Sequence, residues 1–426
     1  MEEELALLWM AEGLIQPGEE TQQMEELGAE YFRNLQLRSF FRQSFKDESQ
    51  FLMNDLFNDL AEWVAGDICF KMEGRVGVNN ERNSSRKVWH LSYLGGQHHG
   101  IQKFDVLNDS TCLQTFLTLM VLYPVGCYLT SKFSLKLLPK LLSIKVLSLS
   151  GYCIYELPKS IGNLKHLRFV NHSLTKIRSL HESVDSLYNL QTLILECCYY
   201  LKKLPSKFGN LVNLRHLNIL GANALEEMPP QIGKLTSLQS LSNLVVGKGS
   251  CSSVKELEPL LHFRKTLCIS RLENVTNHED ARDAMLIEKH NLCGLSLEWS
   301  DNLDESHDIT SELEVLNMLQ PHKGLKELTI KQYGSAKLPA WLSIPEFSNM
   351  VLLKIESCAK CTSLPAVGIL PSLRDLFIKG MANVKNIGCE FYGPFESLQT
   401  LLFEDMQEWE SWIPCGEFAK LRELSI

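Results

Sequence analysis

The 426-residue chain is long for one ordinary domain, and its composition is that of a folded protein, with 45% hydrophobic and 22% charged residues. Its 42 Lys and Arg against 51 Asp and Glu give a formal charge of −9, so a nucleic acid is not expected as a partner. The 13 cysteines show no disulfide-framework spacing, which indicates reduced thiols in a cytoplasmic protein. The acidic start MEEE is unlike a signal peptide, and no run approaches the roughly 20 apolar residues that cross a bilayer, so no membrane is expected.

Residues 1–75 are predicted to form a small helical domain. Apolar residues at helical spacing predict a first helix that ends near Gly13, a second over 24–35 and a third over 52–61. The apolar stripe of the third helix consists of Leu52, Leu56 and Leu60. The three amphipathic helices therefore predict one compact module.

Residues 76–140 are expected to form a connector and the first irregular repeats. The apolar run from Phe116 to Val125 is too short to cross a membrane and contains Pro124. We interpret it as a buried strand.

From residue 141 to 426 the pattern L-x-x-L-x-L returns at intervals of mostly 23 to 28 residues, as in leucine-rich repeats. The middle apolar residues lie at 147, 170, 193, 217, 241, 267, 295, 328, 353, 376, 401 and 424. In L-x-L both apolar side chains point to one face of a strand, which a single strand cannot bury. Stacked copies share one core. The sequence thus predicts an α/β fold, a leucine-rich-repeat solenoid with a curved parallel sheet on its concave side, preceded by the helical domain.

A second pattern with proline and glycine follows three of these strands. It occupies Leu157–Leu164, Leu204–Leu211 and Met228–Leu235. We expect the proline to end the turn, the Ile or Phe to pack inward, and the glycine to permit the return to the next strand.

Three N-terminal runs resemble the winged-helix end of plant nucleotide-binding leucine-rich-repeat disease-resistance proteins of the coiled-coil class. They are LALLWMAEGLIQP (5–17), LGAEYFRNLQLRSFF (27–41) and FLMNDLFNDLA (51–61). Later runs are similar to the repeats of the same family, among them LPKSIGNLKHLRF (157–169) and TLCISRLENVTNHEDARDAMLIEKHNLCGLSLEWS (266–300). The resemblance implies that residues 1–75 are a winged-helix-like domain that ends a nucleotide-binding module.

Two features depart from the family pattern. The phosphate-binding loop G-x-x-x-x-G-K-[ST] does not occur in this sequence, so we expect no cofactor here and ADP or ATP only with a P-loop module. The family's Met-His-Asp motif stands as Met53-Asn54-Asp55. The resemblance implies a nucleotide-sensing position at Asn54, which can donate a hydrogen bond but carries no positive charge. The alternative is that Asn54 only occupies a helix face.

Other candidate sites are set aside. Cys358 and Cys361 have metal-ligand spacing, but no second pair of ligands stands nearby. Aligned on the repeat, Cys358 takes the Asn/Cys position that Cys198 also holds, and Cys361 takes a buried Leu position, so no metal is predicted. We interpret His98, His99 and His307 as residues of exposed loops. No serine or carboxylate motif indicates catalysis, and we expect no enzyme.

The exposed positions around L-x-L would form a surface of mixed charge with aromatic residues, which suits a protein partner. The candidates are Glu196, His216, Glu298, Trp299, Lys331, Lys354, Phe377, Lys379 and Glu404. The resemblance implies an intracellular plant immune receptor whose repeats recognise a pathogen effector or a guarded host protein and restrain their own nucleotide-binding module. The alternative is a truncated scaffold or decoy without a switch.

Overall fold

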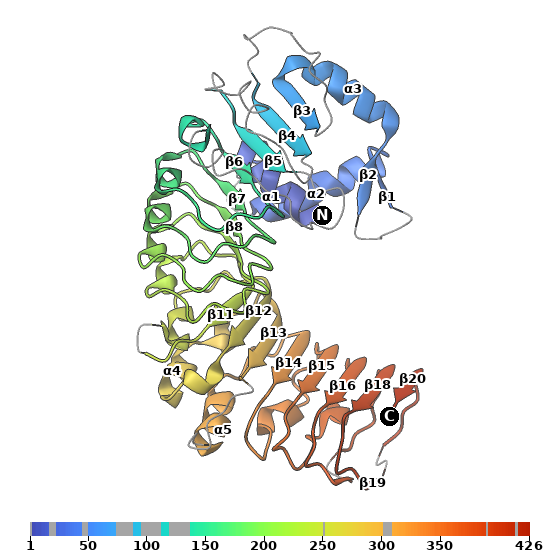
Figure 1. The fold of residues 1–426 in the computed structure, drawn as a ribbon. Helices are drawn as coiled ribbons and strands as arrows, with labels where there is room; N and C mark the ends of the chain where they lie inside the picture. The colour runs from blue at the N-terminus through green and yellow to red at the C-terminus, as the bar shows by residue number, and fades with distance from the viewer. Residues whose placement is uncertain are drawn as a thin grey trace. The chain divides into compact units, whose positions relative to one another are not determined.

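The structure is a computed structural model that describes residues 2–16, 23–44, 50–73, 88–94, 112–118, 137–249, 252–300, 309–388, 391–413 and 416–426. The chain divides into two compact units. The first contains residues 1–206 and 210–224, and the second contains residues 207–209 and 225–426. Each unit holds its own set of parallel strands (Figure 1).

The first unit begins with the two helices that the sequence predicted. They are α1 (Glu2–Glu12) and α2 (Met24–Leu37). Gly13, with a φ of +84°, follows α1, and this left-handed conformation costs glycine little at a helix end.

The third predicted helix is shorter at its start than expected. Residues Phe51–Met53 form strand β2, which pairs antiparallel with β1 (Phe41–Gln43). Helix α3 (Asp55–Ala65) starts only after Asn54, whose side chain accepts a hydrogen bond from the N–H of Leu56 at 3.1 Å. This N-cap sets the boundary, so Leu52 belongs to the strand.

The apolar face of α3 is uncovered within the described residues, where no residue of the helix is buried. Leu56 is 79% and Trp63 81% exposed. Phe57 alone stacks on Phe40 of the hairpin, with ring centroids 3.9 Å apart. The expectation of one compact three-helix core is therefore wrong for α3, since its apolar stripe needs a partner that these residues do not supply.

The sheet of the first unit runs in sequence order with parallel neighbours. Its strands are β3 (Cys69–Glu73), β4 (His90–Leu94), β5 (Thr115–Thr118), β6 (Val146–Ser148), β7 (Phe169–Asn171), β8 (Thr192–Ile194) and β9 (His216–Asn218). The sheet thus begins at Cys69, before the regular repeats. The strand predicted from Phe116 starts within β5, where Phe116 is buried, and its continuation over 119–125 lies outside the described residues.

The strands of the second unit are β10 (Ser240–Leu241), β11 (Asn243–Val245), β12 (Lys265–Ser270), β13 (Leu292–Glu298), β14 (Glu327–Lys331), β15 (Leu352–Glu356), β16 (Asp375–Lys379), β18 (Thr400–Glu404) and β20 (Glu423–Ser425), with β17 (Asn386–Ile387) and β19 (Ser411–Trp412) as a separate parallel pair. Strands β12 to β16 and β18 have five to seven residues and are longer than the three-residue strands β6 to β9. The two longest repeats hold helices α4 (His278–Asp283) and α5 (Ile309–Met318). The widest spacing thus contains a helix. The loop predicted around His307 lies outside the described residues, as do His98 and His99.

The repeat core follows the predicted alternation, and the leucine-rich-repeat fold is confirmed. In β6 Leu147 and the following Leu149 are both fully buried. Ile161 is buried on the opposite side, as the proline and glycine pattern predicted. Gly162 serves a purpose other than the expected turn, because a Cβ there would lie 2.5 Å from the carbonyl oxygen of Ser183 in the next repeat.

One core position of the repeat carries a histidine. His172 stands where most other copies have Leu, Ile or Phe, and its side chain is fully buried. Within the described part of the chain neither ring nitrogen has a hydrogen-bond partner. Burial lowers the pKa of His172 to about 4, so the ring is neutral at pH 7.

We predict that His172→Leu stabilises the protein, because a buried unpartnered polar group costs about 1–3 kcal/mol. Urea denaturation at pH 7 should show an increase of that size in the free energy of unfolding. The folded-state pKa lies below the ordinary value of 6.5, so wild-type stability should fall as the pH drops from about 6.5 toward 4. The variant should lack this component. The control His166→Leu changes an exposed histidine, and an equal gain there would contradict the prediction.

Candidate functional site

The helices of the first unit meet its repeats along one row of side chains, which we call the edge row. It contains Gln114, Lys145, Arg168, Gln191 and Arg215. Each lies one residue before its strand, and its N–H bonds to the carbonyl of the preceding member, at 2.7 Å for Lys145 and 2.8 Å for the next three. Parallel stacking therefore places these side chains side by side, and three of them are cations.

Glu25 of α2 binds one end of the edge row. Its two carboxylate oxygens accept hydrogen bonds from Nε and Nη2 of Arg215, each at 2.8 Å, and Oε1 lies 3.0 Å from Nε2 of His216. Burial by itself would raise the pKa of Glu25, but the hydrogen bonds from His216 and Arg215 outweigh it and hold that pKa well below its usual range. The carboxylate is thus charged, and it ties α2 to β9.

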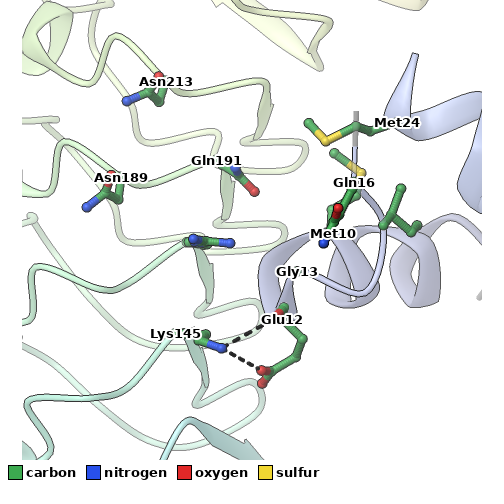
Figure 2. Close-up of a pocket in the computed structure, with 11 residues that line it drawn as sticks. Met10, Glu12, Gly13, Gln16, Met24, Lys145, Asn189, Gln191 and Asn213 are labelled. Atoms are coloured by element: carbon green, nitrogen blue, oxygen red, sulfur yellow. Dashed lines mark hydrogen bonds and ion pairs between the residues drawn. The ribbon is translucent and has the colours of Figure 1, made fainter. Parts of the chain in front are cut away.

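Glu12, the last residue of α1, binds the other end of the row. Its carboxylate lies 3.6 Å from Nζ of Lys145 and 3.6 Å from Nδ1 of His90, and it accepts a hydrogen bond from the hydroxyl of Thr115. Lys145 Nζ also donates to the backbone carbonyl of Glu12 at 3.3 Å (Figure 2). Because α1 has no basic residue in its last turn, Lys145 supplies the cation that a helix C-terminus favours.

A pocket of about 500 Å³ lies between these two ends (Figure 2). The helical side contributes Met10, Ile15 and Met24, and the repeats contribute Arg168 and Gln191. Two asparagines also line it, and their amides bond to carbonyls of the preceding repeat. These are Asn189 to Lys165 at 2.8 Å and Asn213 to Tyr188 at 2.6 Å.

In the second unit, several predicted partner-binding residues join into what we call the charge ladder. Its members are Glu298, Lys331, Glu356, Lys379 and Glu404, which stand opposite one another in successive strands. Lys331 Nζ lies 3.5 Å from Glu298 and 3.4 Å from Glu356, and Lys379 Nζ lies 2.8 Å from Glu404. Burial by itself would lower the pKa of Lys331, but Glu298 and Glu356 raise it above its usual value.

Sequence reasoning missed Glu356, although it holds the same place relative to L-x-L as its neighbours. The row beside the ladder carries Lys354, Phe377 and Leu402 in register. Lys354 Nζ lies 5.4 Å from the ring centroid of Phe377, a cation–π distance. These three side chains are half-buried and together form a mixed apolar and cationic patch.

Two predicted surface residues are buried. Trp299 is 2% exposed and packs against Tyr333, with ring centroids 5.0 Å apart. Strand alternation explains this, because Trp299 shares the inward face with Leu297. His216 is 6% exposed because α2 covers it and Glu25 contacts it. Glu196 stays half-buried and accepts a hydrogen bond from Asn218 at 3.1 Å.

The Met53-Asn54-Asp55 motif lies at the junction of β2 and α3. Asn54 caps α3, as described above, and its own N–H donates to the carbonyl of Phe40 at 2.9 Å. Asn54 therefore precedes the helix and does not lie on its face. Its nucleotide-sensing role stays a prediction.

The cysteine pair occupies the repeat positions that the alignment predicted. Cys358 and Cys361 are both fully buried. Cys198 donates to the carbonyl of His172 at 3.1 Å, and Cys358 lies 3.9 Å from the equivalent carbonyl of Ile330, while Cys361 donates to the carbonyl of Ser335 at 3.1 Å. No three His, Cys, Asp or Glu side chains gather as metal ligands within the described ranges.

We predict that Glu25→Gln destabilises the first unit by about 1–3 kcal/mol, since charge-assisted hydrogen bonds are lost in a largely buried setting. Because the folded-state pKa of Glu25 is depressed, its contribution is complete above about pH 4.5 and is lost as the pH falls through the folded-state pKa. Denaturation from pH 7 to acid measures both effects. Glu156→Gln, at an exposed glutamate, is the matched control, and equal losses in the two variants would refute the role of Glu25.

Among the described residues, no helix is both long and apolar enough to cross a membrane.

Two family descriptions match the chain. Residues 1–61 match the disease resistance protein winged helix domain, and residues 254–381 match the R13L1/DRL21 leucine-rich repeats. Among solved structures, an internalin from Listeria monocytogenes is 16% identical with a TM-score of 0.48, covering 83% of this chain and 94% of that chain.

Curated relatives are similar along almost the whole chain. A putative disease resistance protein of Arabidopsis thaliana is 39% identical over 97% of this chain. A putative disease resistance RPP13-like protein of the same plant is 36% identical over 96% of this chain. A disease resistance protein of Solanum bulbocastanum is 32% identical over 90% of it. The chain spans only 30%, 40% and 36% of the length of these relatives. The chain is therefore a homologue of plant disease resistance proteins and shares their winged helix domain and their leucine-rich repeats.

Proposed function

We propose that this chain acts as the sensing and restraining part of an intracellular plant immune receptor. Its repeats would recognise a pathogen effector or a guarded host protein, and its first repeats would hold the winged helix in a resting position. The observation that carries the proposal is the ion-paired contact of Glu25 with Arg215 and His216. It fastens a domain that in the relatives belongs to a longer protein.

The restraint has a physical basis in the edge row. Two carboxylates of the helices, Glu12 and Glu25, face cations of the repeats at both ends of the row. Moving α1 and α2 away would separate both pairs and return their partly buried charges to water. A partner that competes for Lys145 or Arg215 would therefore loosen the winged helix.

The uncovered face of α3 supports a contact with the protein's own nucleotide-binding module. Leu56, Leu60 and Trp63 are more than half exposed, and apolar helix faces of this kind normally meet a partner. We propose that ADP or ATP binds that module and that this chain holds no cofactor and performs no catalysis of its own. Asn54, at the start of α3, would then lie close to the nucleotide.

For recognition of the partner, we favour the surface that the charge ladder and its neighbouring row form in the second unit. The ladder pairs its own charges, which orders the side chains before a partner arrives and lowers the entropy cost of binding. Phe377, with Lys354 beside it, supplies the aromatic anchor that protein interfaces favour. We therefore propose proteins as the partners of this surface, and neither a nucleic acid nor a membrane.

A charge reversal tests the restraint. In a receptor of the relatives' length that carries this chain, Glu25→Arg should cause defence signalling without a trigger, because the introduced guanidinium would repel that of Arg215. Arg215→Glu alone should act similarly, while the double swap should restore the quiet state in part. Cell death in transiently transformed leaf tissue is the measurement. A truncated scaffold or decoy, the alternative function, would show no response to any of the three.

Loss of the anchor tests the recognition surface. Phe377→Ala and Lys354→Ala should each weaken binding of the identified protein partner by about tenfold or more, with an unchanged melting temperature. Titration calorimetry with purified components measures this. Lys360→Ala, at an exposed lysine outside the row, is the matched control. Full affinity in all three variants would place the partner elsewhere.

A further inference from the structure

The edge row has one more cation than the helices have carboxylates facing it. Lys145 is paired with Glu12 and Arg215 with Glu25. Arg168 stands between them, and within the described residues its guanidinium has neither an ion-pair nor a hydrogen-bond partner. Counting only the part of the chain that the structure describes, one positive charge is therefore unmatched in the middle of the contact.

Arg168, the unmatched cation, lies on the wall of the pocket between α1, α2 and the repeats. Nη1 of Arg168 reaches the α1 end, since a Cβ on Gly13 would lie 3.6 Å from it. The neighbouring Gln191 carries a buried Oε1 that accepts no hydrogen bond in the described structure. The wall thus offers both an anion anchor and an unused acceptor.

The opposite wall carries the apolar side chains of Met10, Ile15 and Met24, beside the polar Glu12 and Gln16. Met10 and Ile15 are each 3% exposed. The pocket volume of about 500 Å³ lies in the range of small-molecule sites, which combine apolar walls with a few fixed polar groups. The guanidinium of Arg168 and the buried, unpaired Oε1 of Gln191 lie across the pocket from these apolar side chains, an arrangement that favours a ligand site.

We propose that this pocket binds a small organic monocarboxylate with an apolar body and one hydroxyl or amide N–H. The carboxylate would take both arms of the Arg168 guanidinium, whose planar fork matches it. The hydroxyl or N–H would donate to Oε1 of Gln191, and the apolar body would lie against Met10 and Ile15. A single negative charge neutralises the row, whereas a phosphate dianion would leave an excess negative charge beside Glu12.

Such a ligand would touch α1, α2 and the repeats at once and would fasten the winged helix to them. This regulatory consequence rests on the proposed restraint, but the binding site itself does not. If the charge swap at Glu25 and Arg215 fails while the ligand binds, only the restraint is wrong. If the swap succeeds and no carboxylate binds, only the ligand site is wrong.

The test uses the full chain and a panel of three carboxylates, para-hydroxyphenylacetate, benzoate and hexanoate. Saturation-transfer NMR and thermal melting should report binding of at least one of them, with para-hydroxyphenylacetate preferred. Its neutral amide should not bind. Arg168→Gln should weaken the binding by about tenfold or more, and Gln191→Leu should remove the preference for the hydroxylated probe over benzoate.

Arg178→Gln changes an exposed arginine of the same unit and should leave the affinity unchanged. Circular dichroism verifies that each variant is folded, and Arg168→Lys, which keeps the charge without the fork, should show an intermediate loss. No binding by any of the three carboxylates would overturn the proposal. So would equal binding by the Arg168→Gln variant, or saturation by inorganic phosphate in preference to the carboxylates.

Discussion

Each repeat buries two inward side chains that it cannot bury alone, and the rest of the structure depends on this constraint. Leu147 and Leu149 illustrate it, since both are fully buried only because neighbouring strands stack on them. Stacking in a parallel sheet fixes the register at one equivalent residue per repeat. Every other position of the repeat therefore becomes a row of side chains. The edge row and the charge ladder are two such rows, produced by the same core.

The two rows differ in how their charges are balanced. In the charge ladder the signs alternate, so Lys331 is satisfied by Glu298 and Glu356 within the row itself. The edge row contains only cations and amides, so its members cannot pair with one another. It needs carboxylates from outside, and α1 and α2 supply them. The composition of the row thus explains why acidic helix residues lie on these repeats, whereas the ladder remains an open surface.

The sequence predicts what periodicity controls and not what tertiary contacts control. The repeat spacing correctly predicted the parallel sheet. The alternation of side chains along a strand would also have predicted the burial of Trp299, which lies two residues after the inward-facing Leu297. The burial of His216 depends on α2, far away in the sequence, so no local signal reveals it. The turns after the strands are similar in this respect. Leu174 and Cys197 have φ values of +59° and +55° there, where glycine is the residue a sequence reader seeks.

The boundary at Asn54 shows two local signals in competition. The spacing of Leu52, Leu56 and Leu60 imitates one helical stripe, but the N-cap preference of asparagine separates the first of them into β2. Asparagine is a good N-cap residue. Asn54, which replaces the family's histidine, therefore has a structural role here as the cap of α3. Through the bond from its N–H to Phe40, Asn54 also couples the start of α3 to the hairpin. A partner that covers the apolar face of α3 would therefore also act on the hairpin. Because Phe41 of the hairpin packs on Phe32 of α2, the effect would reach α2, which carries Glu25.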